Sequence, residues 1–512
     1  MPKYKPVIGL EIHVELNTKT KMFCDSANNP NETNPNTNVC PVCLAHPGTL
    51  PVINIEAVHK VVKVGLALGS KINEYSWFER KNYFYPDLPK GYQISQFEKP
   101  FCEGGVLKLS SGKEIKIKRI HLEEDTGRLV HESEARNPKS EIRKSLVDYN
   151  RAGVPLMELV TEPDIETGVE AKEFGEEFQL LLRYLNVSDA DMEKGQLRIE
   201  VNISLSAIAD LRGKNISVSP RIDQRQSAFL GTKVEIKNLN SFRACERAID
   251  YEIKRQAEVL DGGEKVAQET RGWDENKSET FLQRNKEESH DYRYFPEPDL
   301  PPVRLDKSQI EFIRQELPEL PVSRRERFIK EYGITSKDSE VFTVQKELGD
   351  YFEKVVSELK EWLVSSNSGK AESGLTKLSA NYLITELQKL LSGSDNNVSD
   401  LKISAEDFAE LMVLINQGKI SSSAAQTILA EMFKTGEDPH QILLDKNLGQ
   451  VSDRAELIKA AQEIIAQNPK PVEDYKKGKI ESLKFLVGQL MRATKGKANP
   501  QVGEEILKEL LR

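Results

Sequence analysis

The sequence predicts an α+β protein: a body with a mainly antiparallel β-sheet, followed by helical regions. Up to about residue 300, short segments of alternating polarity are interrupted by helical stretches in irregular order, which is typical of α+β folds. After Pro301 and Pro302 the alternation fades and helical spacing dominates. The length of 512 residues suggests three or four domains. We expect a body over residues 1–300, a helical domain over 301–400 and a helical tail over 401–512.

Strands are predicted wherever apolar and polar residues alternate. Residues 7–16, 198–205 and, more briefly, 233–237 follow a period of two, and residues 115–122 form a strand-like run. This period gives each strand one apolar and one polar face.

Helices are predicted where apolar residues recur every three to four positions. In the body these are residues 55–68, 170–185 and 241–260, the last with Asn240 and Ser241 as N-cap candidates and Gly262 as a stop. Later helices are expected over 309–317, 323–332, 346–363, 379–391, 408–415, 424–432, 453–467 and 480–493. Residues 365–374 and 392–400 are rich in Ser, Gly, Asn and Asp, which predicts loops.

Composition excludes several classes of protein. The net charge of −9 argues against a protein that coats nucleic acid by bulk attraction. No apolar run approaches the roughly 18 residues that cross a bilayer, and no signal or transit peptide is visible before the first strand. Five cysteines, an odd number, indicate no disulfide framework. We therefore expect a soluble, cytoplasmic protein.

The first strand carries the most informative polar face. Its alternation sends Ile8, Leu10 and Ile12 to one side and places Glu11 and His13 together on the other. A histidine nitrogen and a carboxylate two residues apart on a strand can reach one divalent cation. The alternative is a solvated polar face.

Further acids and amides follow the same logic. Glu200 and Asn202 share a face of the strand at 198–205, and Glu123, Glu124 and Asp125 form an acidic triple after the run 115–122. Adjacent like charges need either water or a cation to offset their repulsion. Glu158 lies in an otherwise apolar run, where a carboxylate either has a partner or shifts its pKa.

Aromatic and basic residues mix in two segments, 80–92 and 291–298. Such mixtures can stack a base while a cation holds phosphate, and they also occur at ordinary core edges.

Cysteines offer an incomplete zinc site. Cys40 and Cys43 have zinc-ligand spacing and Cys24 lies upstream, but Ser26 breaks a Cys-x-Cys half-site. A fourth ligand would have to come from His46 or Asp25. Phosphate-binding glycine loops and a Gly-x-Ser-x-Gly nucleophile elbow are absent from the sequence, so any nucleotide site is of an unusual kind.

Taken together, several segments resemble one family, the GatB family of the glutamyl/aspartyl-tRNA(Gln/Asn) amidotransferase, which is the GatCAB complex. The segments that carry the resemblance are 7–16, 80–87, 92–96, 123–125, 237–242, 291–299, 485–489 and 493–500. The resemblance covers nearly the full chain. It implies a cradle-shaped α+β body, a helical domain and a tRNA-binding helical tail.

The resemblance also implies a ligase that forms carbon–nitrogen bonds with glutamine as the amide donor. In the family, the GatB chain uses ATP and Mg²⁺ to phosphorylate the side-chain carboxylate of Glu-tRNA(Gln) or Asp-tRNA(Asn). Ammonia from a partner amidase then completes the amide, and a third, small partner makes the complex a heterotrimer. The metal ligands implied are Glu11, His13 and Glu124. The residues implied for the catalytic site and its walls are Lys81, Tyr83, Glu158, Glu200 and Asn202.

Two other functions fit parts of the sequence: a non-catalytic tRNA-binding adaptor and a structural zinc protein. The adaptor would keep a basic tail and need no metal, and the zinc protein would be built around Cys40 and Cys43. Residues 475–499 contain seven lysines and arginines and one acid, Glu481. This segment is therefore basic although the net charge of the whole chain is negative.

Overall fold

The computed structural model describes residues 3–131, 145–207, 231–285, 292–365, 372–394, 396–449, 454–494, 498 and 500–511. They belong to two compact units, Met1–Leu320 and Pro321–Arg512. Across these described residues, no helix combines the length and the apolar character needed to cross a bilayer.

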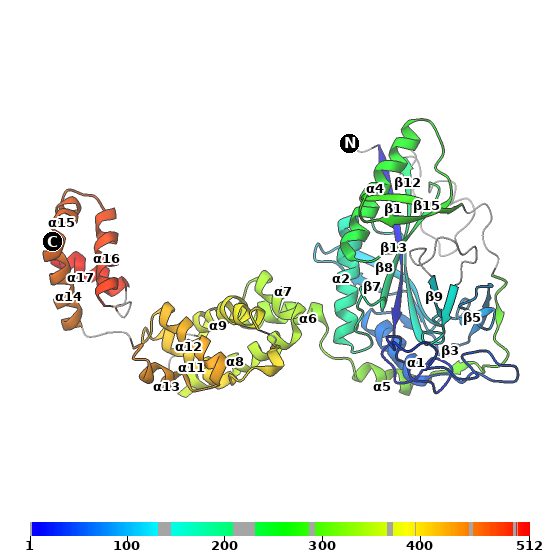
Figure 1. The fold of residues 1–512 in the computed structure, drawn as a ribbon, viewed down its shortest axis with the longest axis horizontal. Helices are drawn as coiled ribbons and strands as arrows, with labels where there is room; N and C mark the ends of the chain where they lie inside the picture. Colours follow the sequence, from blue (N-terminus) through cyan, green and yellow to red (C-terminus); the bar gives the residue numbers. More distant parts are fainter. Residues whose placement is uncertain are drawn as a thin grey trace, which may run out of the picture. The chain divides into compact units, whose positions relative to one another are not determined.

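A large sheet forms the body of the first unit (Figure 1). Among the described residues its ten strands run in the order β15-β14-β13-β12-β1-β11-β8-β6-β2, with β7 beside β8. The pairings are antiparallel except that of β13 with β14. The strands are β1 (Tyr4–Glu15), β2 (Lys71–Ile72), β6 (Cys102–Glu103), β7 (Val106–Lys108), β8 (Glu114–Glu124), β11 (Pro155–Thr161), β12 (Leu197–Ala207), β13 (Val234–Leu239), β14 (Glu269–Asp274) and β15 (Glu279–Asn285).

The predicted α+β class is confirmed, and the predicted strands correspond to β1, β8, β12 and β13. The other strands of the large sheet were not predicted, among them β11, β14 and β15, nor were the strands outside it, whose two to four residues are too few to establish a period. The strands outside it form three small sheets: β3 (Tyr75–Ser76) with β17 (Val303–Arg304), β9 (Arg128–His131) with β10 (Ser145–Asp148), and β4 (Glu79–Asn82) between β5 (Tyr92–Ser95) and β16 (Phe295–Pro296).

Helices cover the apolar face of the large sheet. They are α1 (Ile55–Ala67), α2 (Gly168–Tyr184) and α4 (Phe242–Asp261), while α5 (Lys307–Gln315) packs against α1. Side-chain caps set their starts at Asn54, Thr167, Ser241 and Asp306, as expected for these residue types. Ile8, Leu10 and Ile12 of β1 are 0–1% exposed and share one core with residues of α1, α2 and α4. The opposite face of β1 therefore remains for polar side chains.

The second unit is helical, as predicted. Its helices are α6 (Pro321–Tyr332), α7 (Ser336–Val344), α8 (Lys346–Ser365), α9 (Glu372–Tyr382), α10 (Gln388–Ser392), α11 (Ala405–Asn416), α12 (Ser422–Thr435), α13 (Pro439–Asp445), α14 (Arg454–Gln467), α15 (Pro469–Lys476), α16 (Glu481–Ala493) and α17 (Pro500–Leu511). The helix predicted over 379–391 contains a π-helical segment, Leu383–Leu387, between α9 and α10. Four helices, α7, α13, α15 and α17, were not predicted.

The described residues of this unit form two apolar cores. One joins residues from Phe328 to Ile442, so helices on both sides of residue 400 contribute to it. The other joins Leu457 to Leu511. The predicted domain boundaries at residues 300 and 400 stay predictions.

Candidate functional site

A row of charged side chains crosses the polar face of the large sheet. His13 of β1 lies opposite Glu158 of β11 and opposite Arg198 of β12, and Glu158 in turn lies opposite His121 of β8. Directly opposed residues of neighbouring antiparallel strands point to the same face. The register therefore brings His121, Glu158, His13 and Arg198 into one line.

His13 contacts two carboxylates. Its Nε2 lies 3.5 Å from Glu158 Oε2 and 3.6 Å from Glu123 Oε1. Glu158 Oε2 is also 3.3 Å from His121 Nε2. The ligand atoms of His13, Glu123 and Glu158 lie within 4.8 Å of one another, a donor set that fits a divalent cation.

Charge in this group is balanced by protons. Burial lowers the pKa of His13, but hydrogen bonding to Glu158 and the charges of Glu158, Glu123 and Glu200 outweigh it and raise the pKa to about 9. Burial raises the pKa of Glu158, but His121 and His13 hold it well below its usual range. The protonated imidazole of His13 thus lies between the two acids. A metal cation that binds there would have to displace its proton.

A second group of acids lies on the same face. Oxygens of Glu11, Glu200 and Glu235 lie within 4.8 Å of one another. Asn202 Nδ2 donates a 2.8 Å hydrogen bond to Glu11, and Lys237 Nζ lies 2.8 Å from Glu200 and 3.7 Å from Glu235. Burial lowers the pKa of Lys237, but these two acids raise it above its usual value. The ammonium of Lys237 thus offsets the repulsion within the group.

Both groups line one cavity of about 420 Å³. Lys81 of β4 and Tyr83, the residue after β4, form part of its wall. Lys81 Nζ lies 3.9 Å from Glu123, and the Tyr83 hydroxyl donates a 3.3 Å hydrogen bond to Gln93. Burial lowers the pKa of Lys81, but the charge of Glu123 raises it above its usual value, whereas burial raises the pKa of Tyr83. The structure therefore brings together Glu11, His13, Lys81, Tyr83, Glu158, Glu200 and Asn202.

Glu124 is the exception. Because successive side chains of a strand point to opposite faces, Glu123 faces His13 and Glu124 points away. Its carboxylate lies 2.6 Å from Lys90 Nζ and accepts a 3.0 Å hydrogen bond from the backbone N–H of Ile94. It lines a separate cavity of about 200 Å³. The structure therefore places Glu123, and not Glu124, beside His13, and the role of Glu124 as a metal ligand stays a prediction.

Other cavity residues were missing from the predicted set. Asp125 is 3% exposed and lies 2.6 Å from Arg198 and 2.8 Å from Arg151. Burial raises its pKa, but the two guanidinium groups lower the pKa to about 2. His121 and Glu123 belong to the acidic segment already singled out, and the alternation of residues 233–237 would have identified Glu235. Tyr292 and Tyr294 also line the cavity, whereas Asp291 of the same motif lies outside the described residues.

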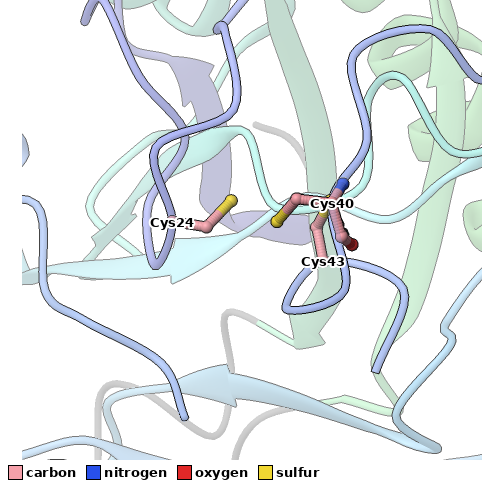
Figure 2. Close-up of side chains that lie close together, drawn as sticks. All are labelled: Cys24, Cys40 and Cys43. Atoms are coloured by element: carbon pink, nitrogen blue, oxygen red, sulfur yellow. Dashed lines mark hydrogen bonds between the residues drawn. The ribbon is translucent and has the colours of Figure 1, made fainter. Parts of the chain in front are cut away.

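Three cysteines cluster near the smaller cavity (Figure 2). Cys24 comes from one loop and Cys40 and Cys43 from another, and their sulfurs lie within 4.8 Å of one another. Among the described residues, neither Asp25 nor His46 adds a ligand atom to this group. The hydrogen bond from Cys24 lowers the pKa of Cys43 to about 4, opposed by burial. Lys21, fully buried, places its Nζ 3.8 Å from Cys43 Sγ.

The basic stretch of the tail is at the surface in its described part. Between α15 and α16, the side chains of Lys477 and Lys479 are 70% and 68% exposed. Lys495 and Lys497 lie outside the described residues.

Comparison with known proteins supports one family. A model of the GatB/GatE catalytic domain matches residues 6–311, and one of the GatB domain matches residues 350–511. The B subunit of the aspartyl/glutamyl-tRNA(Asn/Gln) amidotransferase of Thermoanaerobacter pseudethanolicus is 46% identical over 512 residues, 99% of each chain. Proteins of the same name are 46% identical in Persephonella marina, over 100% of each chain, and 45% in Thermotoga maritima, over 99% of each.

Proposed function

Because the chain belongs to the GatB family of aspartyl/glutamyl-tRNA(Asn/Gln) amidotransferases, we propose that it converts Glu-tRNA(Gln) or Asp-tRNA(Asn) to the amide. The observation that carries the proposal is the group His13, Glu123 and Glu158 inside the 420 Å³ cavity. A cation held by this group would screen from each other the two anions that the proposed reaction brings together, ATP and a carboxylate.

The proposed reaction has two steps. The side-chain carboxylate of the aminoacyl group attacks the γ-phosphorus of ATP, ADP leaves, and an acyl phosphate forms. Ammonia then attacks the acyl carbon, phosphate leaves, and the excess proton is lost to water or a base. The first step replaces a poor leaving group by a good one, which explains why ATP is spent on an amide bond.

The donor set of the cavity fits Mg²⁺. Carboxylate oxygens are its preferred protein ligands, and here Glu123 and Glu158 lie together with the imidazole of His13. Glu11 belongs to the adjacent acidic group and is proposed as a further ligand. When bound, Mg²⁺ supplies positive charge that screens phosphate from carboxylate. His13 must lose its proton to coordinate, so binding at this group releases a proton.

The remaining cavity residues position the substrates. We assign Lys81 and Tyr83 to the wall along which ammonia arrives, and the Lys81 ammonium 3.9 Å from Glu123 holds that acid in place. Asn202 orients Glu11 through its 2.8 Å hydrogen bond, and Lys237 holds Glu200. Glu158 orients the rings of both His13 and His121.

Phosphate release tests the assignment. The chain, assembled with its partner amidase and the third, small partner of the heterotrimer, is incubated with Glu-tRNA(Gln), labelled ATP and magnesium. Glu11→Ala and His13→Ala are expected to reduce tRNA-dependent phosphate release by roughly 100-fold. Lys5→Ala is the matched control, because Lys5 lies on the same strand in a surface ion pair with Glu166. Release that persists in both variants would exclude the catalytic role.

The rival function, a non-catalytic tRNA adaptor, predicts a different result. An adaptor binds tRNA but releases no tRNA-dependent phosphate in any variant. The 420 Å³ cavity favours the enzyme, because an adaptor has no use for buried acids that cost stability to hold together.

The tail is proposed to bind tRNA. The last core, Leu457 to Leu511, is formed from residues of this region alone, so a chain that ends at residue 449 keeps the first two cores intact. We expect that truncation to raise KM for tRNA about tenfold and to spare glutaminase activity of the complex. In the intact complex, KM for tRNA should rise with salt concentration, as phosphate contacts require. An unchanged KM would remove the tail from tRNA binding.

A structural zinc site is proposed for Cys24, Cys40 and Cys43, separate from the reaction. The donor set supports it: the sulfurs of the three cysteines lie within 4.8 Å of one another, and cysteine sulfur is a preferred ligand of structural zinc. Metal analysis should find about one zinc per chain, lost in Cys43→Ser. Substoichiometric zinc in the wild-type chain would contradict it.

A further inference from the structure

One partly buried cation of the active-site cavity, Arg119, forms no ion pair among the described residues, although Glu103 lies opposite it in the register of β6 and β8. Lys81, Arg198 and Lys237 each lie within ion-pair distance of a carboxylate that lines the cavity. Arg119 and Lys233 line the cavity too, and no ion pair within the described ranges includes either. Lys233 is exposed, whereas Arg119 is partly buried. Arg119 is thus a partly buried guanidinium whose charge the described protein groups leave unpaired.

The position of Arg119 is set by β8 and by an aromatic ring. It lies two residues before His121 on the same strand, so both point to the polar face. Its guanidinium carbon lies 5.7 Å from the centre of the Phe97 ring, within cation–π range. Phe97 stacks on Tyr294, with ring centres 4.6 Å apart and an angle of 12° between the planes. This stack supports the guanidinium group at the edge of the cavity.

The hydrogen-bonding state of Arg119 indicates what it recognises. Its Nε is buried and has no hydrogen-bond partner, which is costly for a charged donor. The planar fork of a guanidinium matches the oxygens of a phosphate group. A guanidinium beside stacked aromatic rings is also a frequent arrangement in nucleotide recognition. The cavity also carries clustered acids, which repel phosphate, so an unpaired guanidinium such as that of Arg119 supplies the attraction that a phosphate group needs there.

We propose that Arg119 binds a phosphate group of an adenine nucleotide at this edge of the cavity. The proposal rests on the proposed function, in which two such nucleotides enter: ATP, and the 3′-terminal adenosine of the tRNA with its phosphodiester. Their shared chemistry is a phosphate beside adenosine. Arg119 is then a substrate-binding residue, distinct from the cation-binding group at His13.

Steady-state kinetics of the assembled complex test this. Arg119→Met keeps most of the side-chain volume and removes the charge, and Arg119→Lys keeps the charge without the fork. We expect Arg119→Met to raise KM for one nucleotide substrate roughly tenfold or more, with kcat within threefold of wild type, and Arg119→Lys to recover part of the loss. Arg183→Met, an exposed arginine of α2 that donates to a backbone oxygen, is the control.

The pattern of KM values identifies the source of the phosphate. A higher KM for ATP alone assigns Arg119 to ATP, and a higher KM for aminoacyl-tRNA alone assigns it to the tRNA end. Both KM values within twofold of wild type, or a joint fall of kcat and melting temperature, would overturn the proposal. If the wild-type complex releases no phosphate, it is the proposed function that fails. The role of Arg119 can then still be tested without turnover, by titrating the complex with a non-hydrolysable ATP analogue and with deacylated tRNA and comparing the binding constants of wild type and variants.

Discussion

The two faces of the large sheet use the same strands for opposite purposes. On β1, Ile8, Leu10 and Ile12 are buried beneath helices, while Glu11 and His13 between and beside them face the cavity. Burial of apolar surface stabilises the first face, at about 25 cal/mol per Å². The second face gathers six carboxylates among the described cavity residues, which repel one another unless protons, lysines or a cation offset them. Neighbouring residues of one strand therefore differ in what they do: one stabilises the core, and the next one lines the cavity.

Glu123 and Glu124 give the sharpest test of this separation, because they are neighbours on opposite faces. We expect Glu123→Gln to lower tRNA-dependent phosphate release by roughly 100- to 1,000-fold, since it removes a charge from the group around His13. Glu124→Gln should keep that release within about tenfold and instead lower the melting temperature, because the Lys90 ammonium loses its partner at 2.6 Å. Both are measured with labelled ATP over a magnesium titration.

The magnesium titration decides which acid belongs to the cation site. In Glu123→Gln the magnesium concentration at half-maximal rate should rise; in Glu124→Gln it should match the wild type. The reverse result would restore Glu124 to the set predicted from the sequence and would mean that the face assignment fails at the end of β8.

Ile12 tests the other face. It is 0% exposed in the core beneath the sheet, directly between Glu11 and His13 in the chain. Ile12→Ala should destabilise the body by about 2–5 kcal/mol, and Ile12→Val by about 0.5–1.5 kcal/mol, because each removes buried methyl groups. Urea unfolding of the purified chain measures the loss. Phosphate release per folded molecule should stay within about threefold of wild type, and a larger fall would show that the two faces are coupled.

How much the sequence alone could predict follows from the same alternation. It identified β1, β8, β12 and β13 because their residues alternate with a period of two, which the mostly apolar run of β11 does not, and it placed Glu11 with His13 and Glu200 with Asn202 for that reason. It could not place Glu158 opposite His13, because strand register depends on pairing between segments more than 140 residues apart in the chain.

Other features depend on where a strand ends. The acidic triple was visible, but which of its members faces the cavity depends on whether β8 continues through Glu124, and three consecutive acids show no alternation. Helices α13 and α15 were missed because they have seven and eight residues and begin at prolines, which resemble loop signals in sequence. Arg119 gave no signal, since only the structure reveals a cation that lacks an acid.

Asn202 provides the test with the smallest expected effect, because it acts on the polar face through a single hydrogen bond to Glu11. Its Nδ2 donates to Glu11 at 2.8 Å, and its alanine variant leaves that carboxylate free to turn. We expect Asn202→Ala to raise the magnesium concentration at half-maximal phosphate release about three- to tenfold, with the rate at saturating magnesium within twofold and an unchanged melting temperature. Ser204→Ala, two residues along β12, is the control. If the rate at saturating magnesium falls instead, Asn202 contacts a substrate directly. The strand alone would then hold Glu11 in position, without the hydrogen bond from Asn202.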